Sequence, residues 1–117
     1  MHLTGSNFAH SFLTSANLFN AVPSEANFSF SDLSYADLSF TNVYGANLFS
    51  ANLTDANLTG MENWGKAFWM GATYNQNTIF PAGMESELDY FGMIFVPAPS
   101  ALALLSIAAF TTRRRRS

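Results

Sequence analysis

Large apolar residues recur at every fifth position through the first half of the chain. Twelve successive positions follow this spacing, and only one of them, Pro23, is not a large apolar residue. They are Leu3, Phe8, Leu13, Leu18, Pro23, Phe28, Leu33, Leu38, Val43, Leu48, Leu53 and Leu58. A period of five is neither the 3.6 of an α-helix nor the 2 of a flat strand. The pattern therefore predicts a backbone that returns to the same orientation after every five residues.

The residues around each apolar centre also repeat, most clearly over residues 46–60, which read ANLFSANLTDANLTG. Two residues before the centre stands a small residue: Ala16, Ala21, Ala26, Ala36, Ala46, Ala51 or Ala56, or Ser6, Ser11, Ser31 or Thr41. Directly before the centre stands Asn or Asp in nine repeats: Asn7, Asn17, Asn27, Asp32, Asp37, Asn42, Asn47, Asn52 and Asn57. Short Asn and Asp side chains bond to nearby backbone groups and favour tight bends. We expect the centre and the small residue to face inward, and stacked copies to share one interior.

This five-residue unit resembles the consensus A(D/N)LXX of the pentapeptide repeat proteins, over roughly residues 1–80. The resemblance implies an all-β solenoid, a right-handed quadrilateral β-helix with four repeats per coil, so that residues twenty apart stack. The predicted interior ladders are Leu3, Pro23 and Val43; Phe8, Phe28 and Leu48; Leu13, Leu33 and Leu53; and Leu18, Leu38 and Leu58.

After Leu58 the register changes by one residue. The next centres are Trp64, Trp69 and Tyr74, which places one extra residue near Met61 as a bulge or corner insertion. We expect these aromatic residues to form a closing layer that caps the apolar end of the solenoid. Residues 81–95, which are acidic over 85–92 and break the period, are predicted to be a linker.

The end of the chain carries a second, separate pattern. Val96, Pro97, Ala98 and Pro99 come first, an apolar run over residues 100–112 follows, and Arg113, Arg114, Arg115 and Arg116 stand almost at the terminus. Two prolines favour an extended segment, and the apolar run predicts a hydrophobic helix. Thirteen helical residues span about 20 Å, less than the roughly 30 Å of a bilayer core. We therefore expect a temporary anchor, which the arginines hold on the cytoplasmic side as a stop-transfer signal.

Residues 96–116 resemble the PEP-CTERM sorting signal of exported bacterial proteins, although Ala98 stands where that family has Glu. The resemblance implies transient contact with the bacterial inner membrane and recognition by an exosortase-type enzyme. The chain would then reach the cell envelope or the extracellular space. Its partner there would be an envelope protein or a polysaccharide. A simple tail-anchored membrane protein is the alternative for the same tail.

The position of the first residue raises a separate expectation. Met1 falls inside a repeat, and Leu3 is already an apolar centre. We expect the coding region to begin further upstream, with an export signal there; a start in a frayed first coil is the alternative.

Charge argues against nucleic-acid binding. The net charge is −3, but four of the five basic residues are the terminal arginines. The rest of the chain sets Lys66 against eight acidic residues, a net charge of about −7, which disfavours nonspecific binding to phosphates. The resemblance to pentapeptide repeat proteins also implies an alternative function, because some of them resemble DNA in shape and charge: a cytoplasmic binding module of the DNA-mimic type. The few acidic residues of the repeat and the short stack of coils argue against this alternative.

No catalytic constellation is present in the sequence. His2 and His10 are the only histidines, there is no cysteine, and no Gly-x-Ser-x-Gly occurs. We predict no enzymatic activity, no cofactor and no metal. Outward positions of the repeat carry aromatic residues instead: Phe19, Phe30, Tyr35, Phe40, Tyr44 and Phe49. The four phenylalanines are the candidate partner surface, with Phe19 and Phe40 on one face and Phe30 and Phe49 on another. Shielding of the coil corners is the alternative.

Overall fold

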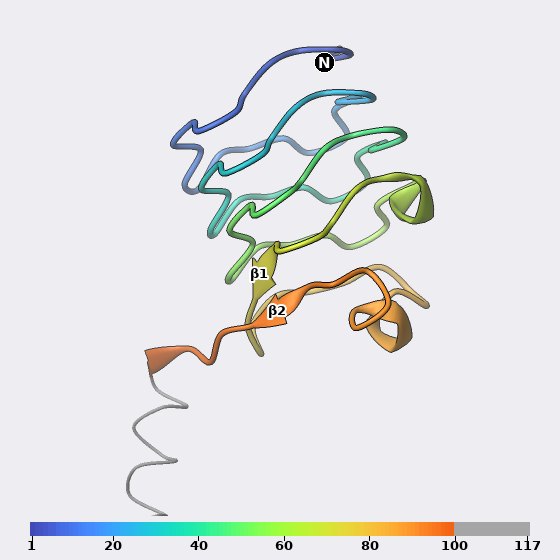
Figure 1. Cartoon of the computed structure of the whole chain (residues 1–117). Coiled ribbons are helices and arrows are strands. Elements are labelled where there is room, and N and C mark those ends of the chain that lie inside the picture. The colour runs from blue at the N-terminus through green and yellow to red at the C-terminus, as the bar shows by residue number, and fades with distance from the viewer. Residues whose placement is uncertain (100–117) are drawn as a thin grey trace, which may run out of the picture.

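A computed structural model describes residues 1–99 of the chain, which wind into stacked coils with the N-terminus at one end (Figure 1). Parallel bridges join residues twenty apart, as in the series Asn7, Asn27 and Asn47. Backbone hydrogen bonds follow the same spacing: Phe8 N–H donates to Asn27 O at 2.7 Å, and Phe28 N–H donates to Asn47 O at 2.7 Å. Four repeats therefore make one coil, and the prediction of a four-sided β-solenoid is confirmed.

Every repeat bends the chain through the same turn. The carbonyl of each centre accepts a hydrogen bond from the amide three residues on, as from Ala16 N–H to Leu13 O at 3.0 Å. The last residue of each repeat has a φ between 56° and 70°. A positive φ at the second central residue alone defines a type II turn. Phe30, Tyr35 and Phe40 also adopt this left-handed conformation, which costs a residue with a Cβ about 1 kcal/mol or more.

The Asn and Asp positions stabilise these turns. In all nine repeats that carry them, the side-chain oxygen accepts a hydrogen bond from the backbone amide two residues on, at 2.9–3.1 Å. One example joins Ser29 N–H to Asn27 Oδ1 at 2.9 Å. The expectation that these residues mark tight bends is confirmed.

The interior is filled as the repeat predicts. Leu33, Leu53, Ala26 and Ala51 are 0% exposed. In the first coil, the centres Leu3, Phe8 and Leu13 are only partly buried, whereas Leu18 is buried. Where a small inward position is polar, it is satisfied locally; Thr41 Oγ1 donates to Leu38 O at 2.7 Å.

Two insertions change the register at the lower end. Glu62 still pairs with Asn42, but Phe68 pairs with Asn47, an offset of 21. The first extra residue therefore lies at the 3-10 helix η1, Trp64–Lys66, a few residues beyond the predicted place near Met61. Trp64 belongs to η1 and is half-buried against the core, so its predicted position as a regular centre is wrong.

The second insertion was not predicted. Ile79 pairs with Asn57, an offset of 22, whereas Thr73 still pairs with Asn52 at 21. Between these two pairs Asn75 and Thr78 are buried, and Thr78 Oγ1 donates to Leu53 O at 2.8 Å. The extra residue therefore makes a wider corner that its own polar side chains satisfy.

Residues 81–98 form a further coil, so the predicted acidic linker over 81–95 is wrong. Met84 is 0% exposed, and Leu88 and Met93 are buried in the same core cluster. The acidic residues of the segment lie outside, including those of the 3-10 helix η2, Glu85–Glu87. Strand β2, Ile94–Phe95, pairs in parallel with β1, Thr73–Tyr74, and both lie at the lower end in Figure 1. The aromatic layer is thus covered by one more turn of the chain.

The predicted hydrophobic helix and Arg113–Arg116 fall in residues 100–117, outside the described part of the chain. Among residues 1–99, no helix has both the length and the apolar character needed to cross a membrane.

Candidate functional site

Four aromatic rings from four successive coils form a continuous column on one side of the solenoid. We call this column, made of His10, Phe30, Phe49 and Phe68, the aromatic stripe. His10 and Phe30 stack with ring centroids 5.0 Å apart and nearly parallel planes, at 4°. Phe30 and Phe49 meet edge to face at 5.3 Å, and Phe49 and Phe68 stack at 6.3 Å. The predicted neighbourhood of Phe30 and Phe49 is correct, and the column is longer than predicted.

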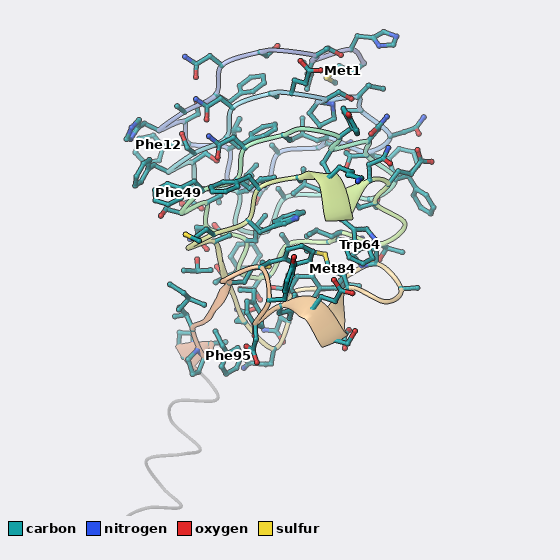
Figure 2. All side chains as sticks on the ribbon, turned by 45° about the vertical axis from the view of Figure 1, so that its right-hand side comes forward. Met1, Phe12, Phe49, Trp64, Met84 and Phe95 are labelled. Atoms are coloured by element: carbon teal, nitrogen blue, oxygen red, sulfur yellow. The ribbon has the colours of Figure 1, made fainter. Side chains whose placement is uncertain are left out.

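Three of the four rings of the stripe, those of His10, Phe30 and Phe68, are exposed, and Phe49 is partly buried. Phe30 and Phe68 are each 52% exposed, and Met70, in the same coil as Phe68, is 54% exposed. In Figure 2 the side chain of Phe49 projects from the coils at the edge of the molecule, on the same side as Phe12. Rings that pack on one another yet stay half-exposed form a surface already ordered before a partner binds, which lowers the entropy cost of binding.

A second, smaller contact joins Phe19 and Phe40, whose rings meet edge to face at 5.9 Å. Both are about half-exposed, at 55% and 51%. A Cβ at Gly60, in the next coil, would collide with the Phe40 ring, so only glycine at this position leaves enough space for the ring. The predicted pairing of Phe19 with Phe40 is correct. Tyr35 and Tyr44 are exposed as well, but neither stacks on another ring among residues 1–99.

Sequence reasoning missed two members of the stripe. His10 stands twenty residues before Phe30, so the repeat itself could have placed it there. Phe68 could have been placed as well, because the predicted shift of one residue makes Trp69 a centre and puts Phe68 directly before it, opposite Asn47. The neighbourhood of Phe30 and Phe49 is therefore confirmed, His10 and Phe68 extend it at both ends, and the role of these rings as a partner surface stays a prediction.

Polar side chains near the lower end satisfy one another rather than form a reactive site. Asp55 accepts hydrogen bonds from Asn75 Nδ2 at 3.1 Å and from Asn77 Nδ2 at 2.9 Å. Ser34 donates from its hydroxyl and its backbone amide to Asp32, and these bonds lower the pKa of the Asp32 carboxyl. Within the described residues, no group of three His, Cys, Asp or Glu side chains is arranged to hold a metal ion. The absence of catalysis and of a cofactor stays a prediction.

The predicted sorting motif begins on the solenoid itself. Val96 N–H donates to Tyr74 O at 2.8 Å, which extends the pairing of β2 with β1. Ala98 N–H donates to Gln76 Oε1 at 3.1 Å, and Ala98 is only 7% exposed. The motif is therefore held at the lower end of the last coil and is not a free linker.

Comparison with known proteins agrees with this geometry. Residues 26–61 match the sequence profile of the family "Pentapeptide repeats" in eight copies. The chain contains pentapeptide repeats. The matched copies have the centres from Phe28 to Leu58, each of which is at most 1% exposed. No curated protein sequence matches the chain.

Solved pentapeptide repeat structures are similar to the chain. One, from Nostoc PCC 7120, has 29% identity over 77% of this chain and 84% of that chain, with a TM-score of 0.39. Rfr23 from Cyanothece 51142 has 34% identity over 68% and 60%, with a TM-score of 0.33. A protein of the Arabidopsis thaliana thylakoid lumen has 25% identity over 79% and 59%, with a TM-score of 0.35. The chain thus spans about three fifths of the latter two.

Proposed function

We propose that the protein is an exported, non-catalytic interaction module of the bacterial cell envelope or extracellular matrix. The observation that carries this proposal is the order of segments after the last coil: Val96–Pro99, an apolar run, and four arginines. A short apolar run followed by a basic cluster can hold a chain in the membrane during export and release it after cleavage. The exosortase-type enzyme of the inner membrane is the processing partner, and the mature chain ends near Val96 to Pro99.

The aromatic stripe supplies the interaction surface in this proposal. Its rings are flat and are ordered by their contacts with one another, and His10, Phe30 and Phe68 are exposed. Such a surface suits the apolar faces of sugar rings or the apolar side chains of an envelope protein better than a charged partner. The contact of Phe19 with Phe40 offers a second, smaller surface of the same chemistry.

Delivery can be tested by fractionation of a bacterium that carries an exosortase-type enzyme. The gene, with its upstream region, is expressed as the natural sequence and with Arg113, Arg114, Arg115 and Arg116 all replaced by Ser. We expect the natural chain in the envelope or medium with a mass that ends near Val96–Pro99, and the variant uncut. Both chains in the cytosol would refute delivery, and an uncut natural chain in the membrane would favour the simple tail anchor.

The interaction surface can be tested with Phe30→Ser/Phe49→Ser, two changes at half-buried or exposed outward positions. We expect the double variant to keep the circular dichroism of the natural chain and to lose most of its retention in the envelope or matrix fraction. Tyr35→Ser/Tyr44→Ser is the matched control, because these exposed rings lie outside the stripe. Equal retention of all three chains would show that the stripe only shields the corners.

A further inference from the structure

We propose that the last coil sequesters the sorting motif, so that processing requires residues 94–98 to detach from the solenoid. The proposal rests on the proposed function, because it concerns the segment that the processing enzyme would recognise. Its physical basis is that the amides of Val96 and Ala98 both donate hydrogen bonds to the preceding coil, one to the backbone oxygen of Tyr74 and the other to the side-chain oxygen Oε1 of Gln76.

The contacts of this segment are those of a strand. Ile94 N–H donates to Ala72 O at 2.9 Å, and Val96 N–H donates to Tyr74 O at 2.8 Å, so alternate amides bond to β1 and to the residue before it. The Phe95 ring lies 5.5 Å from the Tyr74 ring, which in turn contacts Phe80 at 5.4 Å. Backbone pairing and ring packing thus hold residues 94–96 against the coil above.

Gln76 extends this pairing into the motif. Its side-chain oxygen accepts a hydrogen bond from the Ala98 amide, as a backbone carbonyl of a neighbouring strand would do. Ala98 is buried. Pro97 lies between the two bonded amides and has no amide hydrogen to offer. Gln76 is therefore the clasp of the motif, a positioning residue that acts on the segment rather than on a substrate.

An enzyme that cleaves an extended peptide needs the backbone groups and side chains of that peptide for its own contacts. The backbone amides of Val96 and Ala98 are already hydrogen-bonded to the solenoid, and the Ala98 side chain is buried. The segment is at the end of the stack and is covered on one side only, with Ile94 52% and Phe95 50% exposed. End strands of this kind open locally at low cost, so opening limits recognition without preventing it.

The clasp can be tested by amide hydrogen exchange on the full chain. Gln76→Ala removes one neutral hydrogen bond, which changes an opening equilibrium roughly two- to twelvefold. We expect exchange of the Ala98 and Val96 amides to accelerate by that factor, with no change at the Leu53 amide. Asn77→Ala is the matched control, because Asn77 is the next residue, has an exposed amide side chain, and donates its side-chain hydrogen bond to Asp55 and not to the motif. Free exchange of the Ala98 amide in the natural chain would overturn the proposal.

The gate itself can be tested by locking the strand. The natural chain has no cysteine, so the two cysteines of the double variant Thr73→Cys/Ile94→Cys can form a disulfide only with each other. These residues are register partners in β1 and β2, and paired strands lie about 4.8 Å apart, within the range that a disulfide spans. We expect the oxidised variant to resist cleavage in cells until a reductant is added, and Gln76→Ala to be cut roughly two- to twelvefold faster than the natural chain.

Two failures are distinguishable in this experiment. Cleavage of the oxidised variant at the natural rate would overturn the gate and leave delivery intact. A natural chain that stays in the cytosol, as does the variant without arginines, would refute the proposed function and the gate with it. The exchange measurement on purified chain reports on the clasp in either case.

Discussion

Leu53→Ala is expected to lower the free energy of unfolding by an amount in the upper part of the range of about 2–5 kcal/mol that such substitutions cost. Leu53 is 0% exposed and lies in the ladder between Leu33 and Tyr74. Backbone bonds fix the coil above and the coil below, since Leu33 N–H donates to Asn52 O at 2.8 Å and Leu53 N–H to Thr73 O at 2.8 Å. The walls therefore cannot close over the space that the side chain leaves.

Urea denaturation followed by circular dichroism measures this effect. Leu13→Ala is the matched control, because Leu13 occupies the same ladder in the first coil and is only half-buried. Leu13→Ala is expected to lower the free energy of unfolding by less than half as much as Leu53→Ala, because less apolar area is exposed to water in the variant. Equal losses at the two positions would contradict the one-dimensional stack, in which each coil depends mainly on its neighbours.

The regular coils could be predicted from the sequence because every rule that builds them is local. An Asn such as Asn27 bonds to its own turn, and the turn fixes where the next centre points. A spacing of five residues then propagates without error from Leu3 to Leu58. The inward and outward positions, and the neighbourhood of Phe30 with Phe49, follow from that count alone.

The lower end could not be predicted in the same way, because its register depends on insertions. Each extra residue is absorbed in a corner: one at η1, and one between Thr73 and Ile79. Residues 81–95 have their acidic side chains on the surface. Met84 and Leu88, four residues apart in this segment, face the core. A search for a period of five does not detect this packing, because Met84 and Leu88 are four residues apart in the sequence.

The candidate surface and the clasp both depend on these insertions, of which the sequence indicated only the first. Phe68 joins the aromatic stripe only because the insertion at η1 shifts it by one place along the coil. The clasp between Gln76 and Ala98 joins two residues of no distinctive type, 22 residues apart, at a position set by both insertions. Contacts that depend on the sum of irregular steps are found from the structure and not from the pattern.

Trp69→Ala is expected to lower the free energy of unfolding by about 3–5 kcal/mol. Trp69 is 1% exposed, and its indole Nε1–H donates to Trp64 O at 2.7 Å. It lies below Leu48, since Leu48 N–H donates to Phe68 O at 2.7 Å, and it shares the core cluster with Met84 and Met93. Removing the indole leaves a large space at the joint between the regular coils and the last coil.

Trp69→Phe separates the two contributions of this side chain. It retains most of the ring volume and removes the hydrogen bond to Trp64 O, so we expect a loss of only about 1–2 kcal/mol. In Trp69→Ala, but not in Trp69→Phe, the Val96 and Ala98 amides should also exchange faster, because the last coil loses the surface on which it packs. Urea denaturation and amide exchange measure both effects. If Trp69→Ala destabilised the chain no more than Trp69→Phe, the indole would not be the packing joint between the coils.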